Sequence, residues 1–143
     1  MATRSVIVEV TEDGKYRAVY CHNDGYPEYN GLMLERFYNT KEKVKELIDL
    51  GFISSLSKKV KPDENEPHSF SEPAENVSIF YHRDRNDDFE HMAPMVGDTI
   101  DEALSNIEYC YVYIFKDNEW YVDDGVDGPV LVKSLELDTK YVD

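Results

Sequence analysis

The stretch SVIVEVTEDGKYRAVYCH, which runs from Ser5 to His22, decides the fold. Valine alternates with other residues over positions 5–10, and positions 16–22 are again rich in residues that favour strands. The Asp-Gly pair at 13–14 lies between the two runs, and both residues tolerate the positive φ that a tight turn requires. The chain is therefore predicted to open with an antiparallel β-hairpin.

Two helices are predicted after the hairpin. Asn30 is expected to cap a short helix, and the run from Asn39 to Glu42 has the spacing of a capping box that opens a second helix. The second helix is supported by apolar residues at helical spacing and by a glycine that ends it. These residues are Val44, Leu47, Ile48 and Gly51.

A long surface loop is predicted over 57–76, because this segment holds three prolines and few apolar side chains. A short strand is expected at 77–81, where β-rich composition returns. Charged residues end that strand, and the segment 86–97 is predicted to be irregular.

The C-terminal part is predicted to add one helix and more strands. Asp98 is expected to cap an amphipathic helix that carries apolar residues as far as Ile107. A second hairpin is predicted over 109–115 and 119–122, and a last strand over 130–137. In the first of these strands the tyrosines alternate with Cys110, Val112 and Ile114. Aromatic residues of strands are expected in the core, but the tyrosines would line an outer face if those three residues faced inward.

The fold class that follows is α+β, with one domain over 1–143. A chain of 143 residues with 41% hydrophobic side chains can bury one core but is too short for two. The grouped strands and helices favour a mainly antiparallel sheet of five to six strands, with two to three helices packed on one face. Cys21 and Cys110 each lie in an aromatic, strand-like run and are expected to be buried free thiols.

The charge of the chain is divided unevenly. Positions 1–83 hold fourteen acidic and eleven basic residues, whereas positions 84–143 hold sixteen acidic and four basic residues. The net charge of −15 is thus concentrated in an acidic C-terminal part, 84–143. Such a surface repels nucleic acid and anionic membranes and attracts basic proteins. A basic protein partner is therefore predicted, with no direct binding of nucleic acid or membrane.

Ten carboxylates of this acidic part are expected to form one exposed protein-binding face. They are Asp87, Asp88, Glu90, Asp101, Glu102, Glu108, Glu119, Asp123, Asp124 and Asp127.

Several function classes are excluded or not indicated. The chain has no G-x-x-x-x-G-K loop and no G-x-S-x-G elbow, which excludes a phosphate-loop ATPase and an α/β-hydrolase. No run approaches the roughly 20 apolar residues of a membrane span. The segment 123–128 lacks the ligand pattern of a calcium loop. The sequence therefore favours a non-enzymatic protein and assigns no cofactor or metal to it, and it leaves open whether a metal binds and whether the chain forms a homo-oligomer.

Six blocks of this sequence resemble a family of small, largely uncharacterised proteins of tailed phages and prophages. The resemblance implies an accessory protein that acts in the host cytoplasm, and it brings no established activity. The blocks are MATRSVI at 1–7, YCHNDGYPEYNG at 20–31, FYNT at 37–40, LGFISSL at 50–56, FYHRDR at 80–85 and EWY at 119–121.

A pocket for a nucleotide-like ligand is the alternative site. Two His-x-Asp pairs end predicted strands, and the two nearby arginines have the fork geometry that suits a phosphate. The residues of this pocket are His22, Asp24, Tyr26, His82, Arg83, Asp84 and Arg85. The favoured alternative is structural: the polar residues end strands, and the arginines form internal ion pairs with Asp84, Asp87 or Asp88.

The leading functional hypothesis is a counter-defence or host-takeover inhibitor. It would bind a basic host protein, perhaps one that normally binds DNA, by presenting carboxylates where phosphates would lie. The runner-up is a small-ligand protein or enzyme that uses the pocket residues, and a third hypothesis is a minor structural protein of the virion.

Overall fold

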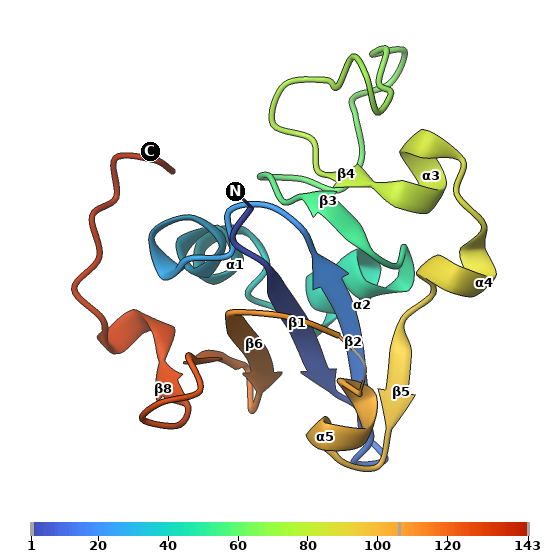
Figure 1. Cartoon of the computed structure of the whole chain (residues 1–143). Helices are drawn as coiled ribbons and strands as arrows, with labels where there is room; N and C mark the ends of the chain where they lie inside the picture. The colour runs from blue at the N-terminus through green and yellow to red at the C-terminus, as the bar shows by residue number, and fades with distance from the viewer. Residues whose placement is uncertain (1, 106, 143) are drawn as a thin grey trace.

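Strand β1 (Ser5–Val10) and strand β2 (Tyr16–Cys21) form the predicted antiparallel hairpin, in which Val8 lies opposite Ala18. Gly14 adopts a φ of 81° in the turn, a conformation that glycine takes without strain. This computed structural model describes residues 2–105 and 107–142 (Figure 1). Three residues lie outside the described part of the chain: Met1, Asn106 and Asp143. Met1 belongs to the first resemblance block, Asn106 to the predicted helix after Asp98, and Asp143 to the end of the predicted domain.

The other strands extend the hairpin on both sides into one sheet of eight strands, with the order β4-β3-β2-β1-β6-β7-β8 and β5 also paired with β2. On the β2 side lie β3 (Ile53–Ser55), β4 (Ile79–Phe80) and β5 (Met95–Gly97). On the β1 side lie β6 (Tyr111–Lys116), β7 (Glu119–Asp123) and β8 (Val130–Leu131).

The α+β class is confirmed, but the predicted sheet is only partly right. The sheet has more strands than the five to six predicted, because β3 and β5 have only three residues each and show no alternation that a sequence pattern could report. β5 lies in the segment 86–97 that was predicted to be irregular. The sheet is mixed: β1 pairs with β6 in parallel, and β2 with β3, whereas the other pairings are antiparallel.

Helices lie on both faces of the sheet, not on one face as predicted (Figure 1). A π-helical turn η1 (Pro27–Gly31) leads into α1 (Leu32–Phe37), and α2 (Lys41–Asp49) follows. The later helices are short: α3 (Tyr81–Arg85), α4 (Phe89–Met92), α5 (Ile100–Ala103) and the 3-10 turn η2 (Val132–Ser134). None of the helices in the described part of the chain is long and apolar enough to cross a membrane.

The two faces of the sheet bury separate cores, because successive residues of a strand point to opposite sides. On the covered face, side chains of the strands pack against α1 and α2; the strand residues are Ile7, Val19, Cys21, Ile53, Phe80, Tyr113, Phe115, Trp120 and Val122. On the open face, the strands pack mainly against α5; the strand residues are Val6, Val8, Ala18, Val112 and Ile114. These two names are used below for the two sides of the sheet.

Two large polar side chains inside the covered face donate to backbone carbonyls. The indole N–H of Trp120 donates to the carbonyl of Tyr38 at 2.7 Å, and the hydroxyl of Tyr113 donates to the carbonyl of Gly25 at 2.6 Å. Tyr113 is fully buried, so it belongs to the core, as the default prediction for these tyrosines has it, and not to an outer face. Cys110 is exposed, so the prediction of a buried thiol is confirmed for Cys21 alone.

The helix caps differ by one residue from those predicted. Thr40, not Asn39, caps α2 by accepting a hydrogen bond from the backbone N–H of Lys43 at 3.2 Å. Thr99, not Asp98, caps α5, which ends at Ala103 instead of continuing to Ile107. Asn30, predicted as a cap, is buried within the π-helical turn, where its amide donates to Ser5 Oγ at 3.2 Å.

Candidate functional site

The ten carboxylates expected to form one face lie at separate places around the sheet. Asp87 and Asp88 lie between α3 and α4, and Glu90 lies in α4. Asp101 and Glu102 lie on α5. Glu119 opens β7, and Asp123, Asp124 and Asp127 lie at its end and in the following turn; Glu108 precedes β6. Figure 1 shows α4, α5 and β8 at three different sides of the molecule. The structure therefore does not gather the ten residues into one cluster.

Four of the ten carboxylates pair with basic side chains of the same chain. The partners are Arg85 for Asp87, His91 for Asp88, Arg4 for Glu108 and Lys133 for Glu119. The other six make no ion pair with a described residue. Asp123 and Asp124 instead accept hydrogen bonds from the backbone N–H groups of Gly125 and Val126, which stabilises the turn. Within residues 2–105 and 107–142, no three His, Cys, Asp or Glu side chains are placed to hold a metal ion.

One hollow lies beside acidic segments and has an apolar floor. It lies on the open face, at the end of the sheet where β1 and β6 finish, and has a volume of about 310 Å³. We call it the acidic-end hollow; its lining residues are Val10, Tyr16, Ile100, Ile114, Lys116, Asp117, Tyr121 and Pro129. Tyr16 and Tyr121 are both half-buried, so each leaves part of its ring accessible.

Carboxylates outnumber lysines in the three segments that meet at this hollow, which are the β1–β2 turn, the β6–β7 turn and α5 with the two residues before it. The carboxylates are Glu12, Asp13, Asp98, Asp101, Glu102 and Asp117, and the lysines are Lys15 and Lys116. Lys15 lies 3.1 Å from Asp98, and this hydrogen bond and the charge of Asp98 raise the pKa of Lys15. Exposed carboxylates in excess of their counterions leave a negative potential over this end of the sheet.

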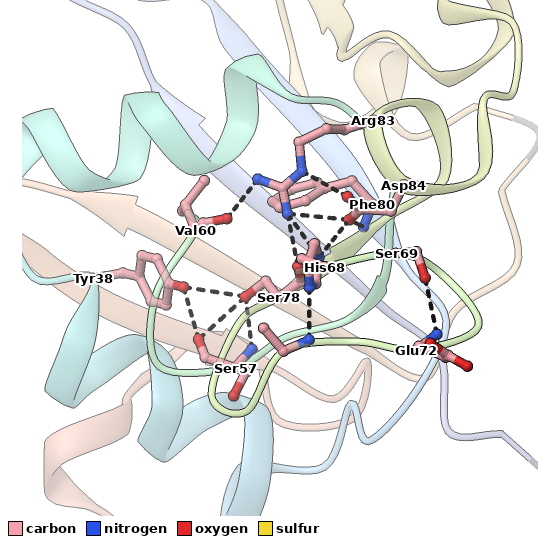
Figure 2. A network of polar contacts seen from close by, with 11 residues as sticks. Tyr38, Ser57, Val60, His68, Ser69, Glu72, Ser78, Phe80, Arg83 and Asp84 are labelled. Atoms are coloured by element: carbon pink, nitrogen blue, oxygen red, sulfur yellow. Dashed lines mark hydrogen bonds and ion pairs between the residues drawn. The ribbon is translucent and has the colours of Figure 1, made fainter. Parts of the chain in front are cut away.

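Arg83, one of the two arginines of the alternative ligand pocket, is held by internal contacts. The guanidinium of Arg83 donates to Asp84 at 2.8 Å and to the backbone carbonyls of Val60 at 2.5 Å and Ser78 at 3.0 Å (Figure 2). The side chain of Asp84 is only 4% exposed and also accepts a hydrogen bond from the N–H of Phe80 at 2.8 Å. Burial acts to raise the pKa of Asp84, but the hydrogen bonds from Arg83 and Phe80 outweigh it and hold the pKa below its usual value.

His68 joins the loop 57–76 to Arg83 and Asp84 (Figure 2). Its Nδ1 accepts a hydrogen bond from the N–H of Ala74 at 2.9 Å, so the proton of the neutral ring lies on Nε2. Nε2 lies 3.2 Å from the carboxylate of Asp84, to which it donates. The contact of Nε2 with Arg83 at 3.3 Å then joins two donors, and it is not a hydrogen bond. We name the set of Arg83, Asp84 and His68 the clasp.

The remaining residues of the predicted ligand pocket do not meet at one place. His22 Nδ1 lies 2.7 Å from the hydroxyl of Tyr20, whereas His82 Nδ1 lies 2.7 Å from the carbonyl of Asp87. Asp24 has a φ of 58°, and its carboxylate lies 3.5 Å from the hydroxyl of Tyr26. In the described residues no hydrogen bond, ion pair or ring contact joins the two predicted His-x-Asp pairs.

Arg85 pairs with Asp87 through two hydrogen bonds, of 2.8 Å and 2.6 Å. The favoured structural interpretation of the two arginines is thus confirmed, since each of them pairs with a neighbouring aspartate.

The sequence prediction missed the residues that line the acidic-end hollow. The two-residue period of a strand could have placed Tyr121 and Trp120 on opposite faces of the sheet. Only the parallel pairing of β1 with β6, however, brings Tyr121 and Ile100 to one place. Neither a family model, nor a curated protein, nor a solved structure matches this chain. The resemblance to phage proteins therefore stays a prediction.

Proposed function

We propose that this chain is a binding protein, not an enzyme, and that its acidic end holds a basic segment of a partner protein. The proposal depends on the acidic-end hollow, which combines an apolar floor with an excess of carboxylates in the segments around it. Lysine and arginine side chains have an aliphatic stem and a charged head, so they can pack on such a floor while their charges meet the carboxylates.

Two properties of the acidic-end hollow and its surroundings support a protein partner. Tyr16 and Tyr121 each present a partly exposed ring, and tyrosine is enriched at protein interfaces because it offers a large, rigid contact area at little cost in conformational entropy. Asp101 and Asp117 are exposed and make no ion pair with a described residue, so a cationic partner does not have to break an existing pair. Complementary charge of this kind accelerates association and selects basic partners.

The biological setting is part of the same proposal and follows from the resemblance. An accessory protein of a phage, acting in the host cytoplasm, could inhibit a basic host protein in this way. If the target normally binds DNA, Asp101 and Asp117 would lie where the phosphates of DNA lie in the binding site of the target. Of the ten predicted carboxylates, the proposal keeps Asp101 and Glu102, and it adds Asp117, which was not among the ten.

The test removes two negative charges beside the acidic-end hollow. The resulting change in affinity is compared with the change caused by removing two negative charges elsewhere on the protein. The test variant combines Asp101→Asn with Asp117→Asn; asparagine tolerates the positive φ of 53° at position 117. The control variant combines Glu90→Gln with Glu136→Gln, two exposed carboxylates away from this hollow, so both variants lose two negative charges. Each immobilised protein is used to capture partners from bacterial lysate, and the captured protein is then titrated at low and high salt.

We expect the wild type and the control variant to capture the same basic protein, with an affinity that falls as salt rises. The test variant should bind it about tenfold more weakly, since two exposed ion pairs contribute on the order of 1.4 kcal/mol together. Equal affinity of the test and control variants, or binding that is insensitive to salt, would contradict the proposal.

A further inference from the structure

A second hollow lies on the open face, beyond α5 and away from the acidic end. Its volume is about 450 Å³, which is in the range of small-molecule sites. Residues from six separate segments line it, including Arg4, Tyr20, Phe52, Tyr81, Arg85 and Glu108. We propose that this hollow, named here the arginine hollow, binds a planar aromatic anion of the size of a nucleoside monophosphate. The proposal is independent of the basic partner at the acidic end.

The walls of the arginine hollow suit a flat ring. The rings of Tyr20 and Phe52 lie 5.9 Å apart, and Tyr81 contributes a third, half-buried ring. Tyr20 is held in place because its hydroxyl forms a 2.7 Å hydrogen bond with His22 Nδ1. Aromatic side chains that are already ordered bind a flat base by stacking, with little loss of conformational entropy.

Arg85 is oriented before any ligand arrives. Its guanidinium lies 4.6 Å from the centre of the Tyr81 ring and 5.0 Å from that of Phe70, and Asp87 accepts hydrogen bonds from its Nε and Nη2. Among the described residues, no hydrogen bond uses Nη1 of Arg85. A fixed guanidinium with a remaining donor is suited to a phosphate or carboxylate oxygen.

Arg4 provides a second positive charge at the same hollow, and its present partner is easily replaced. It makes a single 3.0 Å contact with Glu108, and the two side chains are 44% and 89% exposed. An ion pair this exposed contributes little, so a dianionic phosphate competes well with the Glu108 carboxylate for Arg4. Two arginines on one hollow are notable in a chain of net charge −15, and they favour an anion over a cation or a neutral ligand.

Binding is measured by calorimetry and by thermal unfolding of the full chain with the four common nucleoside monophosphates. Adenosine and inorganic phosphate are tested separately to distinguish recognition of the ring from recognition of the charge. We expect at least one monophosphate to bind more than tenfold tighter than either part alone, because stacking and ion pairing act together. If phosphate alone binds as well, or if no monophosphate binds at millimolar concentration, the proposal is wrong.

Three variants locate the site. Arg4→Gln should weaken monophosphate binding at least tenfold, whereas Lys61→Gln, an exposed change of the same charge outside the hollow, should leave it unchanged. Glu108→Gln should strengthen binding by a factor of about three, because it removes the competitor for Arg4 without changing the walls. A purely structural role of the Arg4–Glu108 pair predicts no gain for Glu108→Gln, so an unchanged or weaker affinity in this variant would overturn the assignment.

Discussion

The covered face and the open face of the sheet differ in how completely helices bury them. On the covered face, α1 and α2 close over the strands, and Trp120 and Tyr113 are fully buried with their polar atoms hydrogen-bonded. On the open face, α5 has only four residues and covers a length of about 6 Å at 1.5 Å per residue. The face therefore keeps a hollow on either side of α5. We infer that the covered face supplies stability and the open face supplies binding.

Neighbouring residues of β7 test this difference most strongly. Trp120 points to the covered face and is 1% exposed, whereas Tyr121 points to the open face and is half-buried. Trp120→Ala should lower the free energy of unfolding by about 4 kcal/mol, because it removes a buried ring and leaves the carbonyl of Tyr38 without its donor. Tyr121→Ala should cost only about 1 kcal/mol. Urea unfolding of both variants measures the two values.

If Trp120→Ala does not fold, Trp120→Phe provides the same comparison with a smaller cavity. Equal losses for the two positions would show that the two faces contribute alike to stability, contrary to the inference.

The clasp tests whether the loop 57–76 belongs to the stable side of the molecule. Asp84→Asn should lower the free energy of unfolding by about 3 kcal/mol, since it leaves the partly buried guanidinium of Arg83 without its anion. Asp63→Asn breaks an exposed pair with Lys59 within the same loop and should cost less than about 1 kcal/mol. Limited proteolysis should cut the loop faster in the Asp84 variant alone.

The pH dependence of the same variant gives an independent measurement. Because the pKa of Asp84 is lowered in the folded protein, its charged form stabilises the fold above its ordinary pKa of about 4, and this contribution is lost as the pH falls through the folded-state pKa. The difference in unfolding free energy between wild type and Asp84→Asn should be constant from about pH 7 to pH 5 and should shrink below about pH 4. A difference that is the same at pH 3 and pH 7 would exclude this role for the carboxylate.

The parts of the fold that the sequence predicts are those fixed by neighbours in the chain. The hairpin of β1 and β2 follows from alternation and an Asp-Gly turn, and α2 follows from one apolar stripe and a glycine stop. The parallel pair of β1 and β6 joins segments about 100 residues apart, and no local pattern reports such a pairing. The strand predicted over 77–81 ends at Phe80, and residues 81–85 form a helical turn in which the carboxylate of Asp84 accepts a hydrogen bond from the N–H of Phe80.

The candidate sites were predictable only as residue types. The excess of carboxylates after position 83 was readable, but their separation into groups depends on which strands are neighbours. The sequence singled out Arg85, which lines the arginine hollow, but it did not single out Arg4, which lines the same hollow. Arg4 lies 81 positions from Arg85, and nothing in its immediate sequence marks it, because the hollow forms only when β1, β2 and α3 are assembled.

The two threonine caps give the smallest effect and separate stability from binding. Thr40 and Thr99 make the same kind of hydrogen bond, at 3.2 Å to the N–H of Lys43 and at 3.1 Å to that of Glu102. Thr40→Ala should cost about 1 kcal/mol, because α2 has nine residues packed on the covered face. Thr99→Ala should cost about half as much, since α5 is a single turn and buries less. Chemical denaturation measures both losses.

Binding should respond in the opposite order. Thr99→Ala loosens the turn that places Ile100 and Asp101 beside the acidic-end hollow, so it should weaken capture of a basic partner, whereas Thr40→Ala should leave that affinity unchanged. Thr99→Ser restores the hydroxyl acceptor and should restore the affinity. If Thr40→Ala weakens binding of the partner as much as Thr99→Ala does, the affinity follows global stability. The open face is then not the separate binding side that its sparse helix cover indicates.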